Sequence, residues 1–102
     1  MYTLEITASA EADLDSITEY ISTRLCNPQA ALSLLDALDL VAETLEENPH
    51  AFSLCADDRL AEMGYRKVVI KSYVLIYEVD EVDHIVRALR FFHESENYVN
   101  KL

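Results

Sequence analysis

Apolar residues recur at helical spacing through the first quarter of the chain. They stand three or four positions apart, at Ala10, Leu14, Ile17, Ile21 and Leu25. This spacing predicts an amphipathic helix of about four turns. Ser9 precedes the pattern and is the expected N-cap, because a serine hydroxyl can accept a hydrogen bond from a free N–H of the first turn.

A second, wider apolar stripe begins after Asn27-Pro28 and stops at Asn48-Pro49. Asparagine caps helices, and proline is tolerated at the first helical position, so both ends of this helix are marked. The link between the two helices is short, and we therefore expect an antiparallel helical hairpin. Such a hairpin has no core of its own, so its stripe is expected to pack against the rest of the domain.

After Gly64 the spacing of the apolar residues changes from the helical period to a period of two, which is typical of β-strands. Residues 65–70, 73–79 and 85–92 are rich in β-branched and aromatic residues and read as three strands, while Thr3 to Ile6 could form a short opening strand. Residues 85–92 are apolar on both faces, as in a central strand. We expect a single α+β domain over residues 1–102, of order β-α-α-β-β-β, with a small antiparallel sheet packed on the helical hairpin. Residues 49–64 are expected to be a loop with one turn near 57–63.

The charge of the chain restricts its partners. Nineteen Asp and Glu against eight Lys and Arg give a net charge of −11, which argues against non-specific binding to nucleic acid. No secretory signal or membrane-spanning run is present, so we expect a soluble cytoplasmic protein. Cys26 and Cys55 show no metal-binding spacing; reduced, packed thiols are favoured over a disulfide or metal site, and no cofactor is expected.

The few cations are concentrated on the predicted sheet. Five of the eight lie there, at Arg66, Lys67, Lys71, Arg87 and Arg90. Aromatic and imidazole groups accompany them, at Tyr65, Tyr73, Tyr77, His93 and Tyr98. Such a surface suits a phosphodiester, because cations hold phosphate while Tyr or His can move protons.

A structural interpretation of the same residues stays open. His93 and Tyr98 could simply pack the end of a strand, and Arg87 and Arg90 could pair with nearby carboxylates. Strict alternation along 85–92 would place Arg87 and His93 on one face and Arg90 on the other. The pattern does not decide which face is buried.

Longer segments resemble a known family in their order and spacing. The segments are Ala12-Asp13-Leu14, Asn27-Pro28, Gly64-Tyr65-Arg66-Lys67, Tyr73 to Glu81, Val86 to His93, Asn97-Tyr98 and Leu102. Together they cover nearly the whole chain and resemble the RelE/ParE toxin superfamily, which includes plasmid stabilisation toxins. The resemblance implies the toxin of a type II toxin–antitoxin module, held inactive by a cognate antitoxin protein in a hetero-oligomer.

The resemblance leaves the target open. RelE-like members cleave mRNA on the ribosome without a metal, whereas ParE-like members inhibit DNA gyrase. An endoribonuclease would use His93, Arg90 and Tyr98 for catalysis, with phosphate or RNA bound by the cations at Arg66, Lys67 and Lys71. The chain has Val74, Ser95 and Glu96 where the family usually has cations. A third alternative is therefore a degenerate, non-toxic member that binds only an antitoxin.

Overall fold

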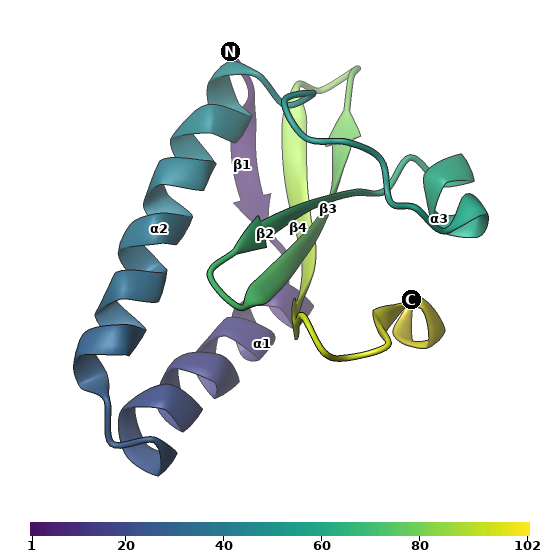
Figure 1. Cartoon of the computed structure of the whole chain (residues 1–102). Helices are drawn as coiled ribbons and strands as arrows, with labels where there is room; N and C mark the ends of the chain where they lie inside the picture. The colour runs from purple at the N-terminus through teal and green to yellow at the C-terminus, as the bar shows by residue number, and fades with distance from the viewer.

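The fold is described from a computed structural model that covers residues 1–102 (Figure 1). Its strands are β1 (Thr3–Ile6), β2 (Arg66–Ile70), β3 (Tyr73–Asp80) and β4 (Ile85–His93). Its helices are α1 (Ala8–Glu19), the π-helical turn η1 (Tyr20–Arg24), α2 (Pro28–Glu47), α3 (Asp58–Glu62) and the 3-10 helix η2 (Tyr98–Lys101). The predicted element order is thus confirmed, and the turn expected near 57–63 is the short helix α3. None of the helices has the length and apolarity to cross a bilayer.

Helix α1 begins at a different residue from the one predicted. Thr7, rather than Ser9, is the N-cap, and its Oγ1 accepts a hydrogen bond of 3.2 Å from the N–H of Ala10. The Thr7 hydroxyl also donates to the carbonyl of Ala88 on β4, at 2.8 Å. Ser9 was the wrong prediction because a bond to a distant strand fixes the start of the helix. The start of α2 is as predicted, with Asn27 Oδ1 accepting from the N–H of Ala30 at 3.1 Å.

The four strands form one sheet in the order β1-β4-β3-β2. Strands β2, β3 and β4 are antiparallel neighbours, as predicted, but β1 runs parallel to β4, so the sheet is mixed. A tight turn imposes the antiparallel direction between consecutive strands. Between β1 and β4 the whole helical hairpin intervenes, and no such turn constrains their direction.

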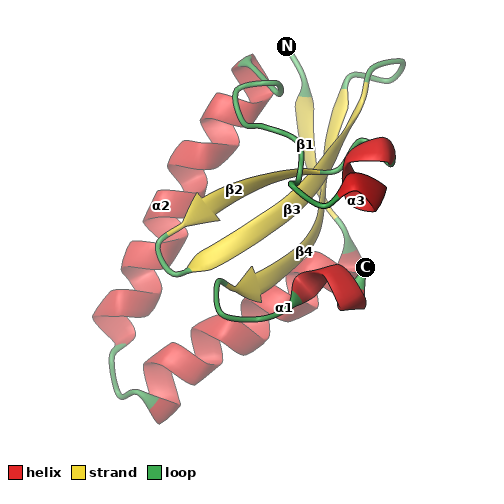
Figure 2. Ribbon diagram, turned by 45° about the vertical axis from the view of Figure 1, so that its right-hand side comes forward, coloured by secondary structure: helices red, strands yellow, loops and turns green.

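Both faces of the sheet are covered. The helical hairpin packs on one face, which we call the helix face, and buries Leu34 and Leu38 of α2 against strand residues such as Val68 and Leu75. The opposite face, which we call the outer face, carries a smaller buried cluster of Cys55, Leu60, Val74, Ile76 and Phe92. Figure 2 shows α3 and the C-terminal helix on the opposite side of the sheet from α1 and α2. The second layer explains why β4 is apolar on both sides.

The two cysteines are both free thiols. Cys55 is buried in the outer-face cluster, but Cys26 is exposed in the link between η1 and α2. The prediction of free thiols is therefore confirmed, whereas the prediction that both are packed is wrong for Cys26. Its backbone adopts a φ of 49°, in the turn that reverses the chain between the two helices.

Candidate functional site

Strand β4, which carries two of the predicted site residues, Arg90 and His93, contains a β-bulge. Tyr77 of β3 lies opposite Ala88, and Ile76 lies opposite Arg90, so Leu89 is an extra residue on β4. A bulge shifts the alternation of every residue that follows it. Arg87 and Arg90 consequently share the outer face, and the prediction that they lie on opposite faces is wrong.

Arg87 is surrounded by carboxylates on the outer face. Its guanidinium lies 3.1 Å from Asp80, 3.5 Å from Glu5 and 3.8 Å from Glu78. The hydrogen bond to Asp80 and the three negative charges raise the pKa of Arg87 above its ordinary value. This arrangement fits the structural interpretation, because the positive charge is already neutralised by the protein itself.

Arg90 is bound by a carboxylate from α1. Its Nε and Nη2 donate to the two carboxylate oxygens of Asp13, at 2.6 and 3.1 Å, in a bidentate pair. Asp13 Oδ2 also accepts the backbone N–H of Phe91, at 3.0 Å. Strand β1 pairs with β4 only as far as Ala88. Beyond Ala88 this edge of β4 has no neighbouring strand, and the Asp13 carboxylate accepts the hydrogen bond of the Phe91 N–H in its place. Arg90 thus helps to attach α1 to the sheet.

The three cations predicted to bind phosphate, two on β2 and one in the turn after it, lie in different places. Arg66 lies opposite the buried Tyr77 and donates to the carbonyl of Phe52 at 2.7 Å, which fixes it on the helix side. Lys67 is on the outer face opposite Ile76, which in turn lies opposite Arg90 on β4. Lys71 lies in the β2–β3 turn, with a φ of 59°. Only Lys67 and Arg90 therefore share one row of the outer face.

His93 lies on the face opposite Arg90. Its ring meets Tyr73 edge-on, with the ring centroids 5.3 Å apart. Nδ1 accepts the backbone N–H of Ser95 at 3.1 Å and lies 2.7 Å from the Ser95 hydroxyl. In a neutral imidazole with an acceptor at Nδ1, the proton is on Nε2.

Tyr98, in contrast, belongs to the outer face. Its ring stacks on Phe92 with the centroids 5.8 Å apart, and the Arg90 guanidinium lies 4.8 Å from the centroid of the same Phe92 ring. The fold thus brings Arg90 and Tyr98 to one aromatic side chain but keeps His93 on the other side of the sheet. A catalytic role for these three residues stays a prediction.

Arg59, which the sequence did not single out, and Val74, noted only as a departure from the family pattern, have clear positions around the site. Arg59 of α3 donates to the carbonyls of Val99 and Leu102, at 2.8 and 3.2 Å, and so holds the C-terminal tail on the outer face. Val74, where the family usually has a cation, is buried beneath this cover. Neither arrangement has a local signal, because each joins segments far apart in the sequence.

Two adjoining hollows flank His93 on the helix side. The larger, of 540 Å³, extends from Ser16 and Tyr20 of α1 to Ser95 and Glu96 in the tail. The smaller, of 370 Å³, lies between the β2–β3 turn and the start of α2. Both are lined by Leu25, Tyr73 and His93, so they form one groove at this end of the sheet.

The fold is similar to those of solved chains from two toxin–antitoxin systems. A chain of the chromosomal ParDE toxin–antitoxin system from P. aeruginosa superposes with a TM-score of 0.70 at 20% identity, covering 91% of this chain and 96% of that one. A chain of the RelBE2 toxin–antitoxin complex from Mycobacterium tuberculosis gives 0.63 at 22% identity, covering 90% and 96%. No curated protein sequence matches the chain.

The sequence itself gives the family. Residues 4–98 match the family described as "ParE toxin of type II toxin-antitoxin system, parDE". The chain therefore belongs to the ParE toxin family, which confirms both the predicted resemblance and the predicted class of function, the toxin component of a type II module.

Proposed function

We propose that this toxin acts by binding a protein target, as ParE-like gyrase inhibitors do, and that it does not cleave RNA. The dispersal of its cations carries the proposal. RNA cleavage without a metal requires a base, an acid and cations around a single phosphodiester. Here Arg66 and His93 lie on the helix side, while Arg87 and Arg90 are bonded to carboxylates on the outer face.

Electrostatics favours the same conclusion. Phosphate binding depends on a positive surface. On the outer face Lys67 is the one strand cation without a carboxylate partner, and the chain as a whole carries −11. Val69, on the same face, and Met63, at the end of α3, are exposed apolar residues, whereas Val74, Ile76 and Phe92 are buried beneath α3 and the tail. A surface of that composition suits contact with a protein better than contact with a nucleic acid.

The second part of the proposal is a cognate antitoxin. The structural neighbours come from toxin–antitoxin systems, which supports a protein partner that neutralises this chain in a cytoplasmic hetero-oligomer. Inducing the chain alone should arrest growth, and co-expressing the small protein encoded beside it should restore growth. Normal growth at high expression, together with a tight complex, would instead identify a degenerate member.

A comparison of two readouts tests the target. In arrested cells we expect inhibited DNA supercoiling and intact transcripts by primer extension. Ribosome-dependent cuts that disappear in His93→Ala or Arg90→Ala, but persist in His84→Ala, would contradict the proposal. His84 is the matched control because it is an exposed histidine in the β3–β4 turn, outside the groove.

A further inference from the structure

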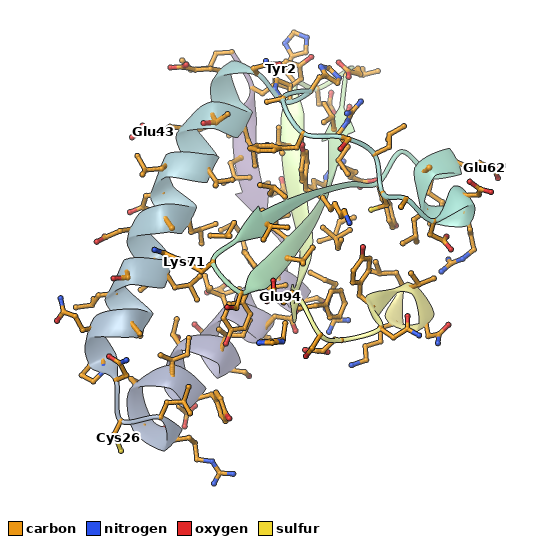
Figure 3. The ribbon with its side chains drawn as sticks, in the orientation of Figure 1. Tyr2, Cys26, Glu43, Glu62, Lys71 and Glu94 are labelled. Atoms are coloured by element: carbon orange, nitrogen blue, oxygen red, sulfur yellow. The ribbon has the colours of Figure 1, made fainter.

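One side of α2 faces solvent along the helix and packs against no other element. This side, which we call the solvent side of α2, carries exposed residues at helical spacing: Gln29, Leu32, Asp36, Asp39, Leu40, Glu43 and Glu47. The opposite side of the helix is buried in the core through Leu34, Leu38 and Leu45. Figure 3 shows the Glu43 side chain directed away from the sheet.

Two large apolar side chains stand on the solvent side of α2. Leu32 is 56% exposed and Leu40 is 67% exposed, so neither contributes much to the core. Eight positions separate them, which is about 12 Å along the helix axis. A single exposed leucine is ordinary. Two of them on one otherwise charged side of a helix form a pair of apolar anchors, of the kind that helices use to dock on a partner.

The charges beside these leucines are all negative. Helix α2 contains no Lys, Arg or His, and its five acids are Asp36, Asp39, Glu43, Glu46 and Glu47. None of these carboxylates takes part in an ion pair. Arg87 and Arg90, the arginines of β4, are bonded to acids of other elements. The protein therefore leaves the charge of α2 without a counterpart.

This arrangement of acids opposes the stability of the helix. Asp39 and Glu43 are four positions apart, as are Glu43 and Glu47, and like charges at this spacing repel one another. The last turn of α2 has acids and no basic residue, although the C-terminal end of a helix dipole favours cations. Helix stability therefore does not account for these acids, whereas a cationic partner would relieve their repulsion.

The charge also selects the kind of partner. A nucleic acid would be repelled, and a second copy of the chain would bring acids against acids. A protein surface that presents Lys and Arg around apolar recesses would gain opposite charges and cover the two leucines. The proposed target is of this kind, because an enzyme that acts on DNA must carry positive surfaces that hold phosphates.

We propose that this toxin contacts its target through the solvent side of α2, which binds a Lys- and Arg-rich protein surface with Leu32 and Leu40 as apolar anchors. The acids attract and orient the partner, and the leucines supply the buried contact. The outer face of the sheet suits a protein by composition alone, whereas α2 adds a charge that specifies which protein. The inference rests on the proposed function, because it assigns a surface to the proposed target.

Binding to purified DNA gyrase at low and high salt provides the first test. The α2 charge variant combines Asp36→Asn, Asp39→Asn and Glu43→Gln. It should bind about tenfold more weakly than the native chain at low salt, with a smaller salt dependence, and inhibit supercoiling correspondingly less. It should unfold at the same urea concentration as the native chain or a higher one, since repulsion within the helix is reduced. Weaker binding then does not reflect misfolding.

A matched control changes the net charge equally at other places. It combines Glu62→Gln, Asp83→Asn and Glu94→Gln, three exposed acids outside α2 that form no ion pair. Its affinity for gyrase should stay within about twofold of the native value. The control therefore separates the position of the charge on α2 from the total charge of the chain.

The leucines provide a second test. The double variant Leu32→Ala and Leu40→Ala should weaken gyrase binding by about tenfold at both salt concentrations, because an apolar contact is not screened by salt. Val82→Ala is its control, since Val82 is 90% exposed in the β3–β4 turn. This control should stay within about twofold of the native affinity.

The outcomes separate this inference from the proposed function. A native chain that binds and inhibits gyrase, with α2 variants that do so equally well or no worse than their controls, overturns the assignment of α2 while the target stands. A native chain that neither binds nor inhibits gyrase overturns the proposed target, and the inference with it. Loss of antitoxin binding alone in the α2 variants, or a dimer of the chain that the leucine variant abolishes, would give this side another occupant and overturn the inference.

Discussion

Replacing Asp13 with alanine should strongly destabilise the protein, although Asp13 lies on a surface helix. Its carboxylate accepts two hydrogen bonds from Arg90 and one from the backbone N–H of Phe91. The Asp13 side chain is only 19% exposed and that of Arg90 is 33% exposed. The substitution would leave a strand N–H and a guanidinium without their acceptor.

The size of the effect follows from these groups. A buried donor without a partner costs about 1–3 kcal/mol. The ion pair adds about 0.5–1 kcal/mol, a discounted value because Arg90 is partly in contact with water. We therefore expect Asp13→Ala to lower the free energy of unfolding by about 2–3 kcal/mol. Asp13→Asn should cost about half as much, because its carbonyl oxygen can still accept the Phe91 N–H.

Urea denaturation followed by circular dichroism measures this difference. With a slope of about 1.5 kcal/mol per molar urea, the midpoint of Asp13→Ala should fall by about 1.3–2 M. Asp15→Ala is the control, since Asp15 is an exposed acid on the same helix whose carboxylate forms no ion pair. The reasoning is refuted if Asp13→Ala and Asp15→Ala unfold at the same urea concentration.

Three further predictions concern titration and the tail. Burial raises the pKa of Tyr77 to about 12, whereas a tyrosine in the unfolded chain has a pKa near about 10, so the protein should be fully stable below about pH 10 and lose stability as the pH rises to about 12. Urea titrations at pH 7 and 11 should show this loss in the native chain. Its persistence in Tyr77→Phe would contradict the assignment to Tyr77. The N–H of Asp83 and the guanidinium of Arg87 lower the pKa of Asp80. The ionised Asp80 therefore stabilises the fold above its unfolded pKa, near about 4, and this stabilisation is lost as the pH falls through the folded pKa. Asp80→Asn should reduce the fall of the melting temperature at acid pH, and an unchanged acid dependence would contradict this assignment. Arg59→Ala should free the C-terminal tail and speed its removal by carboxypeptidase; equal rates in the native chain would show that the two carbonyl bonds do not hold it.

Much of the fold was predictable because its signals are local. The apolar spacing of the hairpin, the Asn27 cap and the period of two after Gly64 each act within a few residues. They gave both long helices, three strands and the element order. The first residue of α1 could not be predicted in this way, because its N-cap Thr7 also bonds to β4, 81 positions away.

The candidate site was predictable only as a list of residue types. Sequence placed Arg66 and Lys67 on β2 and Arg87 and Arg90 on β4, but Lys71 lies in a turn, and the bulge at Leu89 reversed the faces beyond it. No local pattern marks this bulge, because a bulge is a property of two paired strands. The carboxylate partners of Arg87 and Arg90 come from β1, β3 and α1, so their pairing too is invisible in any one segment.

For this protein, the sequence alone determined the family, the order of the elements and the strong negative charge. The tertiary structure decided where its few cations point, which of them are neutralised and which acids remain unpaired. The physical reason is range: periodicity and capping act between neighbours along the chain, whereas ion pairing and strand register depend on residues brought together only by folding.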